Sequence, residues 1–212
     1  MAPMLERSTG GPSGFLHRSR SSFRLSKTPQ LRADAARNRE RLIRVARDKF
    51  AQGEETVSIE AIAQDAGVGI GTFYRHFPTR EVLVEAVYRS ELDALDASAE
   101  HLLANHKAWT ALRLWMDRYA TFVAAKRGMQ DALRIAWTSR SSPVPETRAR
   151  ATASISKFIQ AGICDGTIRT GIESNDVTVG LVGVFLATAS SADKGQVRRL
   201  LDLFADGLHP RP

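Results

Sequence analysis

The stretch IAQDAGVGIGTFYRHFPTREVL, residues 62–83, decides which fold this chain is expected to adopt. Apolar side chains at the start of the stretch and just before it follow the i, i+3, i+4, i+7 spacing of a short amphipathic helix: Ile59, Ile62, Ala63 and Ala66. Gly67 stands where a residue of positive φ commonly ends a helix. Phe73 and Phe77 then resume the apolar period and are expected in the core. Because small residues at positions 63 and 67 let two helices cross closely, the stretch predicts a helix-turn-helix.

Helical patterns continue on both sides of this motif. Upstream, an amphipathic helix is expected from Asp34 to Gly53, and downstream a long helix from Arg80 to about Asn105 could bridge two domains. Further helices are expected at roughly 109–126, 129–139, 146–165, 176–189 and 194–207. No segment alternates as a strand does, so the predicted fold class is all-α. We divide the chain into an arm (1–32), a three-helix helix-turn-helix domain (33–80) and a helical domain (81–212).

Composition excludes several classes of protein. With 212 residues, of which 43% are hydrophobic, the chain can bury a core, and its longest apolar stretch, 177–189, is shorter than the roughly 20 residues of a membrane span. Cys164 is the only cysteine, which rules out an intrachain disulfide and suits a reducing cytosol. The five histidines lack metal-binding spacing. We therefore predict a soluble, cytoplasmic protein with no metal and no cofactor.

The net charge of +7 is concentrated at the N-terminus. Residues 1–33 carry six basic side chains and one acidic one, whereas residues 34–81 carry eight of each. Ser, Gly, Pro and Arg dominate this start without helical or strand periodicity, which predicts a disordered basic arm. The arm could bind DNA phosphates, act as an organelle transit peptide, or have no function.

The stretch 62–83 closely resembles the recognition region of the TetR family, which runs approximately IAxxAGVSxGTLYxHFxxKExL, and the resemblance extends over residues 38–95. It implies a homodimeric, ligand-responsive repressor with an N-terminal DNA-binding domain and a C-terminal domain for ligand binding and dimerisation. It also implies phosphate or groove contacts from Thr72, Tyr74, His76 and Arg80. Ile70 and Gly71 would lie nearest the bases, and Ser58 and Glu60 would also face DNA.

Two departures from the family pattern affect DNA recognition. Gly69 replaces the usual Ser cap of the recognition helix, at a cost of only a few tenths of a kcal/mol. Arg80 replaces the commoner Lys and keeps the positive charge. Because glycines surround Ile70, base readout should be sparse. We expect Ile70 to touch a thymine methyl, Tyr74 and Arg75 to make polar contacts, and Glu60 to accept from a cytosine amino group.

Other interpretations of these residues remain open. Thr72 and Tyr74 could be ordinary helix residues, with Tyr74 half buried, and His76 could be a structural histidine. The sequence GVGIG also looks like a dinucleotide-binding glycine loop, but it follows an amphipathic helix where that loop requires a buried strand.

The C-terminal region supplies candidates for a ligand pocket and a dimer interface. We expect the pocket among large apolar and cationic residues: Trp115, Arg118, Tyr119, Phe122, Met129, Arg134 and Trp137. A cation beside an apolar cavity would select an anionic or carbonyl-bearing ligand; simple core packing is the alternative. The interface candidates combine a ridge of small residues with apolar residues of the last helix: Gly180, Gly183, Ala187, Leu200 and Phe204. Internal packing of these two helices is the alternative.

A chain of this kind could have one of three functions. In the first, two recognition helices roughly 34 Å apart read a pseudo-palindromic operator in double-stranded DNA, and a small-molecule effector, whose identity the sequence leaves open, changes their separation. The second is an enzyme that uses the helical cavity, but no nucleophile-base pair, metal cluster or phosphate loop supports it. The third is an architectural protein bound through its arm. We expect the first function, with no membrane partner.

Overall fold

The computed structural model describes residues 27–51, 57–129, 133–135, 144–191, 193 and 195–210. The described helices are α1 (Lys27–Ala51), α2 (Ile59–Asp65), α3 (Ile70–His76), α4 (Arg80–Asn105), α5 (Ala108–Gly128), α7 (Val144–Cys164), α8 (Ser174–Ala187) and α9 (Gln196–Asp206). The part of the chain that the structure describes contains no strand, so the predicted all-α class is confirmed. Residues 1–37 and residues 38–212 form two units, and the packing below concerns the second.

The helix boundaries follow the predicted ones closely, with one difference at the start. Helix α1 begins at Lys27, seven residues before the expected Asp34, so the prediction of a disordered arm was wrong for residues 27–32, which are helical. The first turn of a helix accommodates Pro29 because the first backbone N–H groups have no intrahelical partner. Of the helix expected at 129–139, the described residues 133–135 are helical. The remaining residues expected in that helix, except Met129, and Gly53 lie outside the described residues.

A capped helix, a glycine turn and two buried phenylalanine rings stabilise the helix-turn-helix. The Ser58 hydroxyl accepts a hydrogen bond from the Ala61 backbone N–H at 3.0 Å and so caps α2. Gly67 has φ +63°, a conformation that favours glycine, and forms the turn between α2 and α3. Phe73 and Phe77 are fully buried, which confirms their predicted place in the core.

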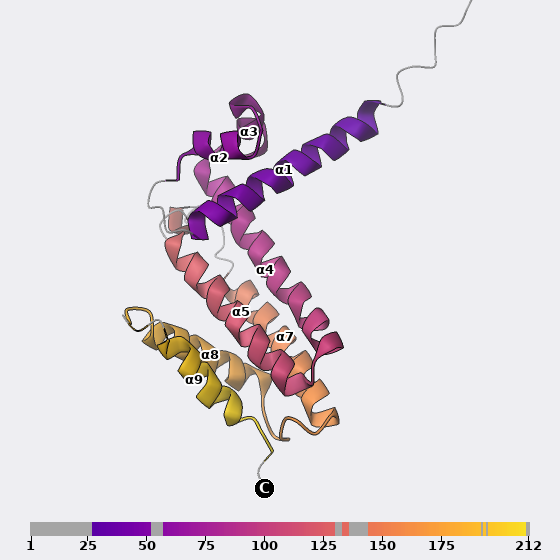
Figure 1. Cartoon of the computed structure of the whole chain (residues 1–212), viewed down its shortest axis with the longest axis vertical. Coiled ribbons are helices and arrows are strands. Elements are labelled where there is room, and N and C mark those ends of the chain that lie inside the picture. The colour runs from indigo at the N-terminus through magenta and orange to yellow at the C-terminus, as the bar shows by residue number, and fades with distance from the viewer. Residues whose placement is uncertain are drawn as a thin grey trace, which may run out of the picture. The chain divides into compact units, whose positions relative to one another are not determined.

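Long helices of the C-terminal region surround a second part of the core (Figure 1). Helix α4 packs against α5 and α7, α7 also packs against α5 and α8, and α9 packs against α5 and α8. Trp115 of α5 is completely buried, and its indole N–H donates to the Leu95 carbonyl of α4 at 3.2 Å. The pairing satisfies the one polar atom of this side chain inside an apolar core.

Residues far apart in sequence fix the beginning of α5. The Asp165 carboxylate, just after α7, accepts from the backbone N–H of Ala108 at 3.0 Å and from that of Thr167 at 3.0 Å. Trp109 donates its indole N–H to the Ala205 carbonyl of α9 at 2.8 Å and stacks on His209. These contacts attach the ends of α7 and α9 to the start of α5.

The described residues lack a membrane-spanning helix and a metal-binding cluster. No described helix has the combined length and apolarity that crossing a bilayer requires. The described His, Cys, Asp and Glu side chains form no group of three that could hold a metal ion.

Candidate functional site

Helix α3 presents one face to the exterior and the opposite face to the core. Ile70 and Tyr74 expose 43% and 45% of their surface, and Gly71 and Arg75 are also exposed. Phe73, on the other side of α3, is completely buried and meets the Tyr74 ring edge-on at 5.6 Å. The predicted base-reading residues therefore share an accessible face that the buried phenylalanines hold in place.

The N-terminus of α3 has no side-chain cap. Gly69 occupies the cap position and offers no side-chain acceptor to the first backbone N–H groups. Such groups at a helix start favour phosphate and other anions. Thr72 and His76, two of the predicted DNA contacts, are half-buried, and His76 lies 6.4 Å from the Phe77 ring.

The residues of α2 and α4 that were predicted to face DNA differ in their surroundings. Ser58 and Glu60 are exposed at the start of α2, where Ser58 also caps the helix. Arg80 is half-buried: its Nη1 donates to the Val57 carbonyl at 2.7 Å, and its guanidinium lies 5.8 Å from the centre of the Phe50 ring. Arg80 thus ties the start of α4 to the segment before α2 and to α1.

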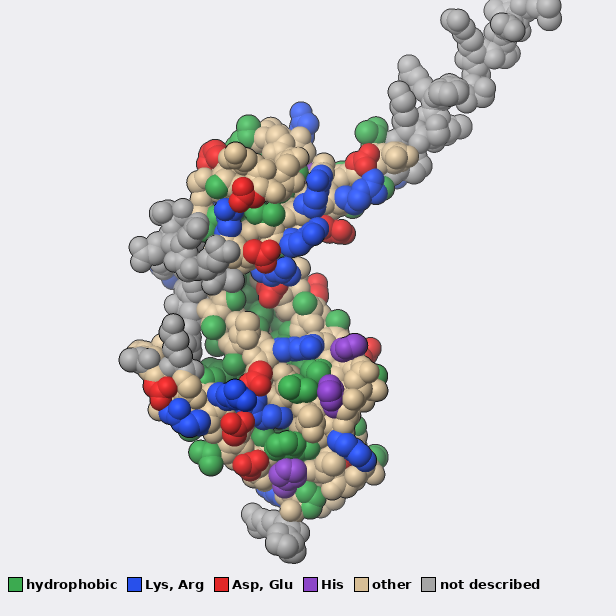
Figure 2. Space-filling view, in the orientation of Figure 1, with side chains coloured by type: hydrophobic (Ala, Val, Ile, Leu, Met, Phe, Trp, Pro, Cys, Tyr) green, Lys and Arg blue, Asp and Glu red, His purple; other side chains and the backbone are tan. Residues whose placement is uncertain are grey.

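Helix α1 carries exposed cations that were not among the predicted DNA contacts. Arg39 is exposed, with its guanidinium 5.1 Å from the centre of the ring of Phe77, the residue at the C-terminal end of α3. Arg41, Arg44 and Arg47 are exposed on the same helix, and Figure 2 shows Lys and Arg side chains gathered along it. The recurrence of arginine every two or three residues along this helix could have indicated a positively charged face.

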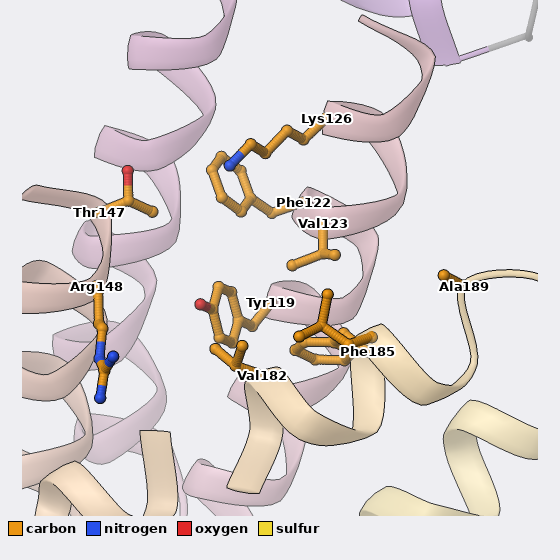
Figure 3. A pocket seen from close by; sticks show the side chains of 10 residues that line it. Tyr119, Phe122, Val123, Lys126, Thr147, Arg148, Val182, Phe185 and Ala189 are labelled. Atoms are coloured by element: carbon orange, nitrogen blue, oxygen red, sulfur yellow. The ribbon is translucent and has the colours of Figure 1, made fainter. Parts of the chain in front are cut away.

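A cavity of about 390 Å³ lies among α5, α7 and α8 (Figure 3). Its lining residues are Tyr119, Phe122, Val123, Lys126, Thr147, Arg148, Val182, Phe185, Leu186 and Ala189. Two of the predicted pocket residues, Tyr119 and Phe122, are among them.

The other predicted pocket residues lie elsewhere. Trp115 and Met129 are buried in the core and do not line this cavity, while Arg118 and Arg134 are exposed. Trp137 lies outside the described residues. In place of Arg118 and Arg134, the cavity has the cations Lys126 and Arg148.

Burial perturbs the polar groups at the cavity. Desolvation lowers the pKa of the Lys126 ammonium, which lies 5.7 Å from the centre of the Tyr88 ring. Burial raises the pKa of the Tyr119 hydroxyl and the nearby Tyr88 raises it further, whereas the positive charge of Arg148 acts in the opposite direction. Arg148 also donates to the amide oxygen of Asn175 at 3.3 Å.

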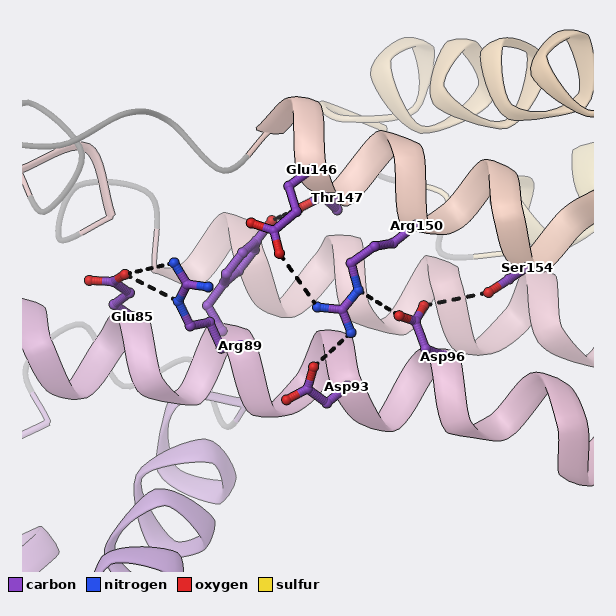
Figure 4. Close-up of polar contacts among 9 residues, drawn as sticks. Glu85, Arg89, Asp93, Asp96, Glu146, Thr147, Arg150 and Ser154 are labelled. Carbon is purple, nitrogen blue, oxygen red and sulfur yellow. Dashed lines mark hydrogen bonds and ion pairs between the residues drawn. The ribbon is translucent and has the colours of Figure 1, made fainter.

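One turn at the start of α7 joins the cavity wall to α4 (Figure 4). The hydroxyl of Thr147, which lines the cavity, shares a buried hydrogen bond with Tyr88 of α4. One turn further, Arg150 forms ion pairs with Asp93 at 2.7 Å and Asp96 at 2.6 Å, both on α4. A displacement of this turn by a bound molecule would act directly on α4.

The predicted dimer residues divide between internal packing and an exposed face. Gly180 packs against the Phe204 ring of α9, where a Cβ atom would overlap that ring, and this contact is internal to the chain. Gly183 and Ala187 are exposed and Leu200 is half-buried. Beside them, Leu186 and Leu203 expose 72% and 69% of their surface. Apolar side chains of that size are costly to leave in water.

Two segments of the chain match known protein families. Residues 42–87 match the family described as "Bacterial regulatory proteins, tetR family". Residues 107–210 match "Transcriptional regulator SbtR-like, C-terminal domain".

Solved structures and a curated protein are also similar. The TetR transcriptional regulator SCO0520 from Streptomyces coelicolor is 38% identical, with a TM-score of 0.73, over 82% of this chain and 99% of that one. The TetR transcription regulatory protein from Mycobacterium vanbaalenii is 34% identical, with a TM-score of 0.67, over 85% and 99%. The HTH-type transcriptional regulator SAR0097 of Staphylococcus aureus is 34% identical over 80 residues, which are 37% of this chain and only 42% of that protein.

Proposed function

Because the chain belongs to the TetR family of transcriptional regulators, we propose that it binds a pseudo-palindromic operator as a homodimer and represses the adjacent promoter. A small-molecule effector that enters the cavity among α5, α7 and α8 releases it from DNA. The observation that carries the proposal is the outward face of α3. Exposed Ile70, Tyr74 and Arg75 project there beside an uncapped helix start.

Individual roles at the DNA follow from exposure. Ile70 touches a thymine methyl, Gly71 allows close approach to the bases, and Tyr74 and Arg75 make the polar contacts. Thr72, His76 and Ser58 contact phosphates at the edges of the groove, and Glu60 accepts from a cytosine amino group. Arg80 has an internal partner in the Val57 carbonyl, so we assign it to positioning α4 rather than to a phosphate.

Dimerisation uses the exposed face of α8 and α9. Gly183, Leu186 and Ala187 of α8 and Leu200 and Leu203 of α9 offer small and apolar side chains suited to contact with a second copy. Packing these two helices against the same pair of a partner subunit would make a four-helix interface of the isologous kind. Gly180 and Phe204 support that surface from within the subunit.

The domain division proposed for the chain follows these roles. Residues 1–32 add affinity as a basic arm, residues 33–80 read DNA, and residues 81–212 bind the effector and the partner subunit. The protein acts in the bacterial cytoplasm, on chromosomal DNA, and without catalysing a reaction.

Selection of bound sequences from a random DNA pool, with the full chain at physiological salt, tests the proposal. Enrichment of one palindrome is the expected result, and a promoter carrying that palindrome should be silenced when the protein is expressed with it. Binding without sequence preference, together with a steep salt dependence, would instead favour the architectural function. An unchanged promoter would contradict repression.

A further inference from the structure

We propose that the cavity among α5, α7 and α8 takes an uncharged, largely apolar molecule with one carbonyl group, and that the Tyr119 hydroxyl donates a hydrogen bond to that carbonyl. The inference rests on the proposed ligand-responsive function, and it specifies the chemical class of the ligand. Its basis is a buried hydroxyl without a partner among the described residues, set in a wall that is mostly carbon.

Tyr119 is buried, with 4% of its surface exposed, yet its hydroxyl has no hydrogen-bond partner among the residues that the structure describes. A buried tyrosine hydroxyl usually has such a partner. Tyr88, which is also buried, follows this rule because its hydroxyl is bonded to that of Thr147. In Figure 3 the Tyr119 hydroxyl points into the cavity, towards the side of Thr147 and Arg148. A bound molecule can supply the missing partner.

Aromatic neighbours fix the position of this hydroxyl. The ring centres of Trp115, Phe122 and Phe185 lie 5.2, 6.2 and 5.3 Å from that of Tyr119. Trp115 is itself held by its hydrogen bond to the Leu95 carbonyl. Because close-packed rings leave little room for rotation, the Tyr119 hydroxyl keeps one direction. A donor that is already oriented favours a ligand whose acceptor reaches it without rearrangement.

The Tyr119 hydroxyl acts as a donor to the ligand. Burial raises its pKa and the nearby Tyr88 raises it further, so the hydroxyl keeps its proton at neutral pH. The positive charge of Arg148 also reaches this hydroxyl, since it acts on the same pKa in the opposite direction. A positive charge on this side favours the oxygen end of a carbonyl dipole over a donor group of the ligand.

The cations at the cavity already have other contacts, which favours an uncharged ligand. The Lys126 ammonium lies 5.7 Å from the centre of the Tyr88 ring. Arg148 is exposed and donates to the amide oxygen of Asn175 at 3.3 Å. A carboxylate would have to give up its hydration and compete with these contacts. An ammonium would find no acidic side chain among the described residues that line the cavity.

The remaining wall and the volume limit the body of the ligand. Phe122, Val123, Val182, Phe185 and Ala189 contribute side chains of carbon alone. At about 390 Å³, the cavity lies near the lower end of the range of roughly 300–1,000 Å³ that is usual for small-molecule sites. It fits a molecule of one or two rings, or a medium aliphatic chain, with its carbonyl at Tyr119.

Three probes with the same naphthalene body test the chemical class. They are 2-acetylnaphthalene, which has a carbonyl, 2-isopropylnaphthalene, which has no acceptor, and 2-naphthoate, which is charged. Equilibrium dialysis against the full chain gives the three dissociation constants. We expect the ketone to bind at least about tenfold more tightly than the naphthoate, because burial removes the hydration of the anion. A naphthoate that binds as tightly as the ketone, or a ketone that does not bind, would overturn the proposal.

Tyr119→Phe tests the residue responsible. The variant should weaken binding of the ketone about fivefold, the equivalent of one net hydrogen bond, and leave 2-isopropylnaphthalene within about twofold. Thr121→Val is the matched control. It removes another hydroxyl of α5, which donates to the Asp117 carbonyl at 3.0 Å and does not line the cavity, so both affinities should stay unchanged. Unchanged ketone binding in Tyr119→Phe, or an equal loss for both probes, would contradict the assignment.

Two further measurements check the unpartnered hydroxyl itself. Tyr119→Phe should not lower the free energy of unfolding, because the hydroxyl has no protein partner to lose; a decrease would contradict that premise. Infrared difference spectra of the ketone bound to the wild-type chain should show its carbonyl band below the position in an alkane solvent, as expected of an accepted hydrogen bond. A band at the alkane position would overturn the proposal, and this result decides if Tyr119→Phe does not fold.

Operator binding by the same samples separates this inference from the proposed function. A protein that selects a palindrome but binds the naphthoate as tightly as the ketone keeps the proposed function and refutes the uncharged carbonyl class. A protein that binds the ketone through Tyr119 but selects no DNA sequence keeps the ligand class and refutes the operator-reading function.

Discussion

The Tyr88 hydroxyl of α4 and the Thr147 hydroxyl of α7 share a buried hydrogen bond. Thr147 also lines the cavity, next to Arg148, and α4 begins only four residues after the end of α3. This single bond therefore connects the wall of the candidate ligand site to the helix that follows the recognition helix. It offers a direct route by which an occupied cavity can displace α4.

Removing this hydrogen bond should lower the free energy of unfolding. It should also weaken the effect of a bound ligand on DNA affinity. Tyr88→Phe and Thr147→Val are each expected to reduce the free energy of unfolding by about 1 kcal/mol, because each removes the buried hydrogen bond between the two hydroxyls. In a double-mutant cycle measured by denaturant unfolding, the two changes should fall short of additivity by a similar amount. Additive losses would show that the two hydroxyls do not interact in solution.

Salt dependence should separate the DNA-facing arginine from the structural one. Arg75→Gln is expected to reduce the slope of log affinity against log salt by about 1, because the change removes one cation from the DNA surface in addition to its polar contact with a base. Arg80→Gln should leave that slope unchanged and lower thermal stability instead, because Arg80 donates to the Val57 carbonyl. Fluorescence anisotropy on the selected operator gives both slopes. A reduced slope for Arg80→Gln would restore its phosphate role.

Charges on the exposed face of α8 and α9 should separate the dimer. Leu186→Glu and Leu203→Glu place a carboxylate at positions that are 72% and 69% exposed in one chain, so the single subunit should still fold. Light scattering should give the mass of one chain for these variants and of two chains for the wild type. Leu114→Glu, at an exposed leucine of α5, is the control and should remain dimeric. If light scattering still gives the mass of two chains for Leu186→Glu and Leu203→Glu, the dimer interface lies on another surface.

The cap that Asp165 provides for α5 should appear as a pH-dependent stability. Hydrogen bonds from the Ala108 backbone and the Thr167 side chain lower the pKa of Asp165 below its ordinary value of 3.8. The charged form is thus favoured in the folded state, so the stabilisation is complete above the unfolded pKa and is lost as the pH falls through the lower folded one. Asp165→Ala should cost about 1 kcal/mol at neutral pH and progressively less in acid.

A neighbouring acidic residue provides the control for this cap. Glu173 stands at the N-cap of α8 but makes no side-chain capping bond, so Glu173→Ala should change the free energy of unfolding little. Denaturant unfolding between neutral pH and pH 3 measures both variants. A loss for Asp165→Ala that stays constant over this range would exclude the carboxylate charge as its cause.

The helix-turn-helix could be predicted from sequence because its determinants are local. The apolar spacing of Ile59 to Ala66, the positive φ of Gly67 and the burial of Phe73 and Phe77 depend on residues within one short stretch. The internal role of Arg80 was not predictable in this way. Its partners, Val57 and Phe50, come close only when α1 and α4 are in place.

The cavity was only partly predictable, because its lining depends on which face of α5 meets α7 and α8. Tyr119, Phe122, Val123 and Lys126 follow the i, i+3, i+4, i+7 spacing, so Lys126 shares a face with the two predicted aromatic residues. Arg118 was expected there as a cation within the aromatic-rich segment that contains Tyr119. One residue rotates a helix by about 100°, however, and Arg118 lies exposed. Arg148 and Thr147 join from a distant helix, which periodicity cannot indicate.

The spacing of the two half-sites in the selected palindrome tests the central claim most directly. Inserting five base pairs at its centre turns one half-site by about half of the 10–10.5 base pairs in a helical turn, away from its recognition helix. If two α3 helices of one dimer read the operator, affinity in anisotropy titrations should fall by about 10³, towards non-specific binding. An affinity unchanged by the insertion would contradict a dimer that reads both half-sites at once.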